Sequence, residues 1–395
     1  MMKHGWIVFA LTFVLGLFVV TANTQALDEE ALKAEIKKEI KEEMKAEEGP
    51  LAAIQDHIKL SGLIEVGAVW QDIEYEGATP TEPEDESDLC LTTVELTVEA
   101  EINKWVNVAA TFLYEDPTFD EETSVDIDVA TVTIGNTEEY PLYCTAGKMY
   151  VPFGALLTHF PDDPLLDAPL TLLLGETLEK AFLVGVEHQG FSVSAYAFNG
   201  DVDEFGEDNN VEGYGLDANY SFDDEKGFDI LIGASYISNI ADSDGLTDSL
   251  GDDDRHGGPG LGLEEIDDYV DGFDAYLHVG YAGFFVDAEY MTALDNFEPH
   301  ELAKDFGKAE PEVWNFEVGY NLDWGRNLEI VLKYAGSDEA EALGFPEERY
   351  GICLNQELYK DVIASLGYLY DDYENDDIYT RDDRDLVFAQ IAVEF

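Results

Sequence analysis

Residues 88–102 read DLCLTTVELTVEAEI and show the clearest alternation of apolar and polar residues in the chain. Cys90 and Val94 fall on one side of this stretch, whereas Glu95 and Glu99 fall on the other. Successive side chains of a β-strand point to opposite faces, so a period of two predicts a strand with one apolar and one polar face. The same period resumes after a three-residue link, which predicts a hairpin.

Working outward from this hairpin, the period recurs along the chain and divides it into sixteen segments. These segments cover approximately 57–70, 88–102, 106–115, 124–135, 142–150, 181–189, 191–199, 213–222, 228–238, 272–281, 284–294, 312–323, 326–336, 348–356, 362–370 and 385–395. The connections between them alternate strictly between short and long. Short turns on one side and long loops on the other are the pattern of an outer-membrane barrel.

Aromatic residues support this interpretation. Tyr and Phe gather near the ends of the segments, for example in 368–370 and 284–285, where the aromatic girdles of a membrane barrel lie. An even number of strands also lets the first and the last pair antiparallel and leave no open edge. We therefore predict an all-β fold, a porin-like, 16-stranded antiparallel transmembrane β-barrel over residues 57–395.

The region before the barrel divides into two parts. Residues 1–26 combine a basic start, an apolar run and a small-residue ending, which predicts a secretory signal peptide; a membrane anchor is the alternative. Residues 27–50 place Leu32, Ile36 and Ile40 at every fourth position, which predicts a short helix on the periplasmic side. This helix is either a coiled coil that self-associates or a solvated tether.

The composition limits the class of partner. The chain of 395 residues holds 87 Asp+Glu against 20 Lys+Arg, a formal net charge of −67. Phosphate binding needs clustered Lys and Arg, so nucleic acid is excluded as a partner. Aromatic residues make up 12% of the chain and hydrophobic residues 46%, enough to fold. Three widely spaced cysteines, Cys90, Cys144 and Cys353, do not make a disulfide framework.

Enzymatic motifs are missing from the sequence. It contains no nucleophile elbow, no zinc-protease motif, no phosphate-binding glycine loop and no paired cysteines at metal spacing. The histidines are scattered singly, and we interpret them as unrelated surface or lumen residues. We therefore expect no enzyme, with a hydrolase at the barrel rim as a weak alternative.

Residues 151–180 differ from the other long loops because they are rich in Leu and Pro. A general porin folds one long loop into its lumen. An apolar segment of this length is costly at an exposed tip, so we expect it to fold inward or to pack at a trimer interface. Its acids would then line the constriction or, equally, satisfy the turns of the loop. The residues predicted to line the pore are Glu95, Glu99, Glu101, Lys148, Asp217 and Glu317 on strands, and Asp162, Asp163, Asp167, Glu176 and Glu179 in the loop.

The other long loops are rich in acids, above all residues 239–271 and 371–384. Hard oxygen ligands suit Ca²⁺ or Mg²⁺, so these loops are candidates for divalent cations that bridge to anionic lipopolysaccharide. Solvated, mutually repelling loops are the favoured alternative. The weak calcium candidates are Asp242, Asp244, Asp252, Asp253 and Asp254, and we predict no other cofactor.

Three stretches resemble the LbtU family of siderophore porins: GKMYVPFG at 147–154, DAPLTLLLGET at 167–177 and FNGD at 198–201. The resemblance extends over nearly the whole chain, including the leader, the short coiled coil and the barrel. The chain departs from the family pattern at Ala168, which is inserted before Pro169, and at Leu173, where the family carries an acid. The resemblance implies outer-membrane uptake of an iron–siderophore complex.

Taken from the residues alone, the sequence predicts an outer-membrane porin for passive uptake of small solutes through an acidic, water-filled lumen. We expect a homotrimer in contact with outer-membrane lipids and lipopolysaccharide. Two alternatives stay open. One is a general cation-selective diffusion porin without siderophore specificity. The other is an outer-membrane anchor whose acidic loops bind partners.

Overall fold

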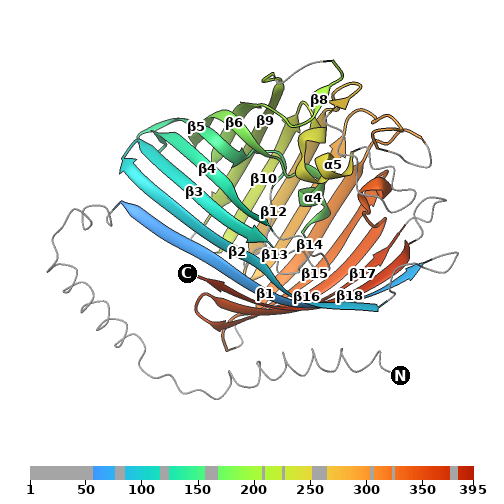
Figure 1. Cartoon of the computed structure of the whole chain (residues 1–395). Coiled ribbons are helices and arrows are strands. Elements are labelled where there is room, and N and C mark those ends of the chain that lie inside the picture. Colours follow the sequence, from blue (N-terminus) through green and yellow to red (C-terminus); the bar gives the residue numbers. More distant parts are fainter. Residues whose placement is uncertain are drawn as a thin grey trace.

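The computed structural model describes residues 57–75, 85–115, 124–155, 168–206, 210–224, 227–250, 265–302, 307–322, 325–373 and 381–395. Their strands form one closed antiparallel barrel (Figure 1). The predicted signal peptide, 1–26, and the predicted helix, 27–50, lie outside the described residues. No helix in the described part of the chain has both the length and the apolar character needed to cross a membrane.

Sixteen strands make up the barrel, as the alternation predicted. They are β1 (Ile58–Tyr75), β2 (Asp85–Asn103), β3 (Val106–Glu115), β4 (Ser124–Asn136), β5 (Tyr140–Tyr150), β6 (Leu178–His188), β7 (Phe191–Phe198), β9 (Gly213–Asp223), β10 (Phe228–Ile237), β12 (Gly272–Tyr281), β13 (Phe284–Ala293), β14 (Glu312–Leu322), β15 (Leu328–Asp338), β16 (Glu348–Tyr359), β17 (Val362–Asp372) and β18 (Arg381–Glu394).

Every barrel strand pairs with its neighbours along the chain, and β1 pairs with β18 to close the sheet. Main-chain hydrogen bonds of 2.9 and 3.0 Å between Gly62 and Phe395 complete this closure. One end of the barrel carries the short turns and the other carries the long loops; we call them the short-turn end and the long-loop end. A closed sheet leaves no unpaired edge among these strands.

The period of two separates an outer from an inner face. On β6, Phe182 and Val184 are 54% and 39% exposed, whereas Ala181 and Leu183 between them are 6% and 7% exposed. The exposed apolar side chains form the outer face of the barrel. The buried set faces the interior, where polar residues such as Glu179 join it.

A β-bulge interrupts the alternation on β2. The pairing of β1 with β2 shifts register between Glu65 and Gly67, so that Cys90 lies opposite Gly67 and Val94 lies opposite Ile64. Gly67 and Ile64 are three residues apart on β1 and therefore face opposite sides. The prediction that Cys90 and Val94 share a face is therefore wrong, because a bulge adds one unpaired residue and reverses the alternation. Cys90 faces inward.

Aromatic rings on the inner face lie against glycines of the adjacent strand. A Cβ added at Gly185 would lie 2.3 Å from the ring of Tyr143, and one added at Gly215 would lie 2.2 Å from the ring of Tyr196. Only glycine allows so close an approach. The same arrangement pairs Gly233 with Tyr276, Gly319 with Phe285 and Gly367 with Phe388. The rings therefore lie along the wall instead of projecting into the interior.

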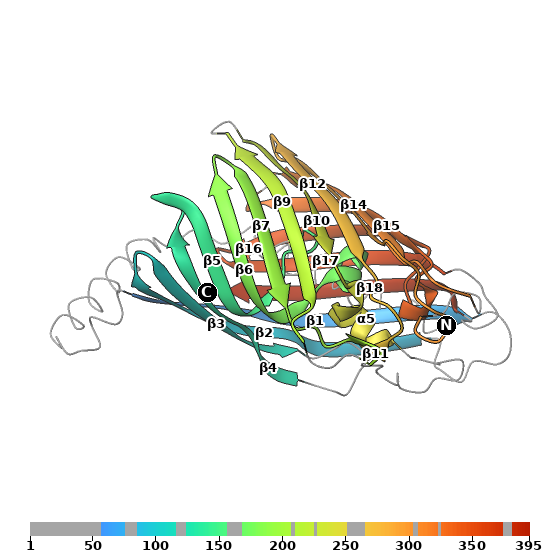
Figure 2. The same ribbon diagram turned by 90° about the horizontal axis from the view of Figure 1, so that it is seen from above.

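Two of the long loops carry short helices into the barrel. The loop between β5 and β6 contains α4 (Leu170–Gly175), and the loop between β10 and β12 contains η1 (Ile240–Asp242), α5 (Asp244–Ser249) and β11 (Glu265–Ile266). β11 pairs in parallel with β8 (Asp203–Glu204), and η2 (Glu341–Leu343) follows β15. α4 and α5 lie within the outline of the barrel in Figure 1, and Figure 2 shows α5 inside the wall from above.

The largest buried apolar cluster lies inside the barrel, between these loops and the wall. Phe153, Leu170 and Leu174 of the first loop are 0% exposed. They belong to one cluster with Ile237 of β10 and Met291 of β13. Leu170 and Leu174 are four residues apart, so they share one face of α4, and that face packs on the wall. The described parts of the predicted inward loop, residues 151–155 and 168–177, thus pack into an inner core.

Candidate functional site in the barrel interior

The loop between β5 and β6 crosses the interior, and α4 contacts β13, β14 and β15 on the far wall. Polar contacts attach it there. The Gly154 N–H donates to Ser235 Oγ of β10 at 2.9 Å. The Ala155 N–H donates to Glu289 Oε1 of β13 at 2.6 Å, and the Thr171 hydroxyl donates to Glu289 Oε2 at 2.5 Å. One carboxylate therefore holds both described segments of the loop, 151–155 and 168–177.

Glu289 has a second acidic group beside it. Asp274 of β12 is 0% exposed and Glu289 is 6% exposed, and the two side chains interact. Two ionised carboxylates at such a short separation repel one another in a buried site. A pair of side chains that shares one proton therefore fits this geometry better than a pair in which both are ionised. The loop thus rests on a buried carboxyl pair that sequence reasoning did not identify. In the sequence, both residues are only positions within segments of alternating polarity.

A second loop supports the first from the long-loop end. The Asp244 N–H, at the start of α5, donates to the Glu176 carbonyl at the end of α4 at 2.9 Å. Asp242 is 4% exposed, and its carboxylate accepts from the Val202 N–H and from the Asn239 amide, each at 3.0 Å. Burial, together with the charge of Asp201, raises the pKa of Asp242 to about 7. Asp242 therefore anchors the loop packing.

This arrangement bears on the weak calcium candidates. The oxygens of Asp242 are occupied by protein donors, and the side chain of Asp244 is exposed. Asp252, Asp253 and Asp254 lie outside the described residues. Within the described part of the chain, side chains with converging ligand atoms occur elsewhere: Asp267, His300 and Glu301 form one group, and Glu74, Asp382 and Asp383 form another.

The predicted lining residues of β2 lie on the inner face, near the short-turn end. Glu99 faces Lys59 of β1 across 3.8 Å, and the Thr97 hydroxyl donates to Glu95 at 2.7 Å. Glu99 and Glu101 are exposed and line a cavity of about 770 Å³ together with Lys59. These carboxylates are accessible from the interior.

Two other predicted lining residues are buried in the wall. Asp217 is 5% exposed and accepts from the Tyr276 hydroxyl at 3.0 Å and from the Asn219 amide at 2.8 Å. Glu317 is 2% exposed and lies 3.4 Å from the ammonium of Lys333. Both residues face inward, but neighbouring groups satisfy their charge.

The loop acids have different positions. Glu176 ends α4, where its N–H donates to the Leu172 carbonyl at 2.8 Å. Glu179 faces inward on β6 and is 4% exposed. Asp162, Asp163 and Asp167 lie outside the described residues.

Lys148 occupies the outer face of β5. It pairs directly with Lys180 of β6, which alternates with buried Ala181 and shares its face with exposed Phe182. Met149, the next residue, is 7% exposed and faces inward. The ammonium of Lys148 donates to the Ile127 carbonyl at 3.0 Å. Its side chain therefore does not line the interior, contrary to the sequence prediction, because the parity of β5 directs it outward.

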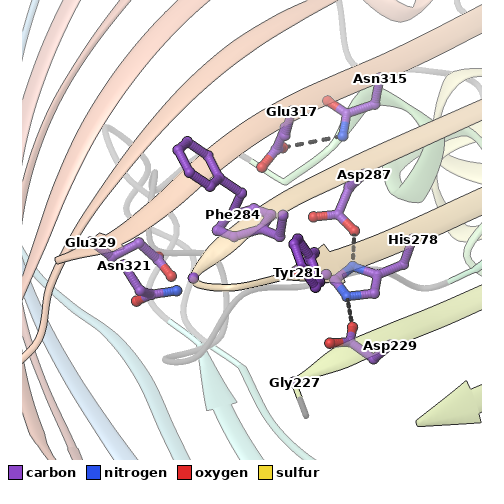
Figure 3. Close-up of a pocket in the computed structure, with 13 residues that line it drawn as sticks. Gly227, Asp229, His278, Tyr281, Phe284, Asp287, Asn315, Glu317, Asn321 and Glu329 are labelled. Atoms are coloured by element: carbon purple, nitrogen blue, oxygen red, sulfur yellow. Dashed lines mark hydrogen bonds and ion pairs between the residues drawn. The ribbon is translucent and has the colours of Figure 1, made fainter. Parts of the chain in front are cut away.

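A histidine between two carboxylates lines the wall of a second cavity, of about 470 Å³ (Figure 3). His278 of β12 places Nε2 at 2.7 Å from Asp229 Oδ2 and Nδ1 at 2.5 Å from Asp287 Oδ1. A neutral imidazole has a single N–H, so two carboxylate partners fit the doubly protonated, positive ring. Asn315, Glu317, Asn321 and Glu329 add to the polar lining. Two carboxylates around one imidazolium make the wall of this cavity net negative at Asp229, His278 and Asp287.

Sequence reasoning missed this trio because His278 read as one of several isolated histidines. The signal that identifies it is strand register: His278 lies directly opposite Asp287, and Asp229 lies two positions from Leu231, the partner of His278 on β10. Register depends on turn lengths and bulges, which a single sequence specifies poorly.

Arginines cluster near the long-loop end of the inner wall. Arg349 of β16 donates to Asp371 of β17 through Nε at 2.7 Å and through Nη2 at 3.0 Å. Arg384 of β18 donates to the same carboxylate at 2.5 Å. Asp371 is 0% exposed and its pairing with the two guanidinium groups leaves this patch positive. In the sequence, Asp371 was counted only among the acids of the last loop.

Comparisons with known proteins agree with the barrel. No protein-family model matches the chain. A UPF0422 protein of Coxiella burnetii (strain RSA 493 / Nine Mile phase I) is 25% identical over 273 residues, which cover 68% of this chain and 56% of the relative. UPF0422 protein lpl2888 of Legionella pneumophila (strain Lens) is 28% identical over 298 residues, 72% of this chain and 54% of the relative. The chain spans about half the length of these curated relatives.

Solved structures with the same fold are outer-membrane porins. OprB of Pseudomonas putida superposes with a TM-score of 0.55 at 11% identity, over 88% of this chain and 96% of that one. OmpF of Salmonella typhi, in complex with daunomycin, gives 0.54 at 13% identity over 86% and 97%. The outer membrane channel DcaP of Acinetobacter baumannii gives 0.51 at 12% identity over 86% and 97%. At these identities the likeness establishes a porin-like fold.

Proposed function

We propose that this protein is an outer-membrane porin through which small solutes diffuse passively, with a preference for cations. The observation that carries this proposal is the loop between β5 and β6. It crosses the interior of a closed barrel and is attached to the far wall through Glu289. A barrel that served only as an anchor would have no need of an inner loop held by buried polar contacts. The fold of the solved porins supports the same proposal.

The preference for cations rests on the inner wall. Glu99 and Glu101 are exposed to the interior, and Asp229 and Asp287 outnumber the positive His278 between them. Inward Lys333 is matched by Glu317 at 3.4 Å. Carboxylates lining a pore concentrate cations and repel anions. Within the described residues, the Arg349–Arg384 patch and Lys59, 3.8 Å from Glu99, oppose this field.

Reconstitution in planar lipid bilayers tests the proposal. The purified full chain is expected to form conducting channels whose reversal potential in a salt gradient indicates cations as the more permeant ions. A closed barrel, with no conductance, would instead support an anchor or interaction protein. Channels that prefer anions would contradict the role proposed for the inner carboxylates.

Two matched double variants locate the selectivity. Glu99→Gln with Glu101→Gln removes two interior charges and is expected to shift the reversal potential towards anions. Glu312→Gln with Glu348→Gln removes the same charge from side chains that accept hydrogen bonds from Tyr290 and Tyr350. This control is expected to keep the wild-type potential. Equal shifts in both would show that net charge alone, and not its position, sets selectivity.

The finer proposal is that iron–siderophore complexes are among the solutes. It is supported by the resemblance of 147–154, 167–177 and 198–201 to the siderophore porins. Several residues of these stretches, including Phe153, Leu170 and Phe198, belong to the inner core and shape the loop. Uptake of a labelled ferric siderophore into proteoliposomes, compared with a neutral sugar of equal size, tests it. Equal uptake rates for the siderophore and the sugar would contradict siderophore specificity and support a general diffusion porin.

Location and assembly belong to the same proposal. We expect an exported protein in the outer membrane and a homotrimer, as the predicted signal peptide and the porin-like fold suggest. Fractionation of cell envelopes checks the first expectation. Chemical cross-linking of the folded protein in detergent checks the second, and a monomeric product under all conditions would contradict it.

A further inference from the structure

Two lysines lie side by side on the outer face of the barrel. Lys148 of β5 and Lys180 of β6 are direct cross-strand partners. Exposed Phe182 shares their face. The other lysines in the strands that the structure describes, Lys59 and Lys333, face inward and each has a glutamate partner, at 3.8 and 3.4 Å. The outward pair is therefore distinct in both position and surroundings.

Like charges directly opposite one another destabilise a sheet. The chain could have relieved this repulsion with acids, since it holds 87 Asp+Glu. Yet within the described residues neither ammonium forms an ion pair. Asp128 on the neighbouring strand β4 is 8% exposed and accepts from the Tyr150 hydroxyl at 2.7 Å. Glu179, next to Lys180, faces the interior.

The pair lies close to the long-loop end. Lys148 is two residues before β5 ends at Tyr150, and Lys180 is two residues after β6 begins at Leu178. Two residues of strand span about 7 Å, which the stem of a lysine covers. A lysine at this depth of a membrane barrel costs little and presents its ammonium at the level of the lipid head groups.

We propose that Lys148 and Lys180 form a binding site for the phosphate of a lipid head group in the leaflet at the long-loop end. A phosphate with two or more charged oxygens contacts both ammonium groups and turns their mutual repulsion into attraction. It is also the anion that a lipid surface presents beside an outward-facing side chain. Under the proposed function that leaflet is the outer one, so the inference rests on that proposal, and its lipid is the phosphorylated lipid A portion of lipopolysaccharide.

Native mass spectrometry of the purified full chain, titrated with lipid A, tests the site. Lys148→Gln with Lys180→Gln is expected to weaken lipid A binding by about tenfold or more, whereas Lys148→Arg with Lys180→Arg is expected to retain it. The matched control is Lys308→Gln with Lys360→Gln. It removes the same charge from exposed side chains that pair with Glu298 and with Asp361. This control is expected to bind lipid A like the wild type.

Further arms separate the sources of the anion. Lipid A stripped of its phosphates is expected to bind the wild type as weakly as the glutamine variant, and inorganic phosphate is expected to compete. Equal lipid A affinity in wild type and glutamine variant would overturn the proposal. So would a glutamine variant that binds lipid A normally but loses its oligomeric state, which would assign the lysines to a subunit interface.

Single-channel conductance measured on the same samples keeps the two proposals apart. The glutamine variant is expected to conduct like the wild type, which also shows that it folds. A wild type that does not conduct but binds lipid A through the two lysines would contradict the porin proposal alone. A conducting protein without lysine-dependent binding would contradict the lipid site alone.

Discussion

At the scale of single residues, Glu289 has a disproportionate role. Its two carboxylate oxygens accept from Ala155 and from Thr171, which belong to the two described segments of the inner loop, 151–155 and 168–177. A hydrogen bond to a charged group contributes more than one between neutral groups, and a buried charge that loses its donors is costly. The position of the whole loop therefore depends on a small number of donors around one side chain.

Thr171→Val tests this dependence with little change of shape. The variant removes one donor to Glu289, a loss of about 1.5–3 kcal/mol from the attachment of the loop. We expect noisier single-channel currents and faster proteolysis of the loop. Thr177→Val is the control, since that hydroxyl donates to the Gly175 carbonyl within the loop itself. Unchanged currents in Thr171→Val would mean that the apolar core alone holds the loop.

Asp242 makes the packing of the second loop depend on pH. Burial raises its pKa to about 7, so the folded loop binds the proton more tightly than the unfolded chain does. The contribution of Asp242 to the stability of the folded loop is therefore greatest below about pH 4 and is lost as the pH rises towards about 7. Hydrogen-exchange protection of residues 237–250 is expected to fall over this window in the wild type and to fall less in Asp242→Asn. Parallel pH profiles for both would contradict the assignment, and Asp244→Asn serves as the control.

At the scale of elements, the strands follow from the period of two, and β3 and β12 begin and end at the predicted residues. The period of two predicts the wrong face of the sheet where strand pairing, and not the local sequence pattern, determines the direction of a side chain. The bulge that turns Cys90 inward arises from the register of β1 with β2. Lys148, which was predicted to line the pore, faces outward because of its position in the alternation of β5. Glu289 contacts the inner loop, and His278 contacts one carboxylate on each of the two strands beside it. The pattern of a single strand indicates neither set of contacts.

The aromatic–glycine pairs allow a test at the level of neighbouring strands. Gly185→Ala places a Cβ about 2.3 Å from the ring of Tyr143, closer than any van der Waals contact. The ring must then rotate off the wall into the cavity that it lines, at a cost of about 1–3 kcal/mol. We expect a lower single-channel conductance that Tyr143→Ala restores in the double variant. A double variant that stays as narrow as Gly185→Ala would show that the strand itself had moved.

At the scale of the whole molecule, charge is distributed by surface. The formal charge of −67 is the property of the chain as a whole, whereas exposed apolar side chains cover the outer face of the strands. Carboxylates occur on the inner face, where Glu99, Asp229 and Asp287 are held by or beside positive groups. A channel of this kind acts on ions through a field that extends beyond any single residue.

The salt dependence of selectivity measures that field. The Debye length falls from about 10 Å at 0.1 M salt to about 3 Å at 1 M, so the inner carboxylates act over a shorter range at high salt. The cation preference is expected to decrease as the mean KCl concentration rises, with a shallower decrease in the Glu99→Gln and Glu101→Gln variant. Reversal potentials at several mean concentrations and a fixed ratio measure it. A preference independent of salt would point to steric selection.

The inner core also constrains the order of assembly. Phe153 and Leu170 come from the loop after β5, but their partners Ile237, Met291 and Val313 come from β10, β13 and β14. Contacts so distant along the chain form only after the intervening hairpins are in place. An incomplete barrel consequently exposes this apolar surface to its own interior, and the channel reaches its final width only after β14 has joined the sheet.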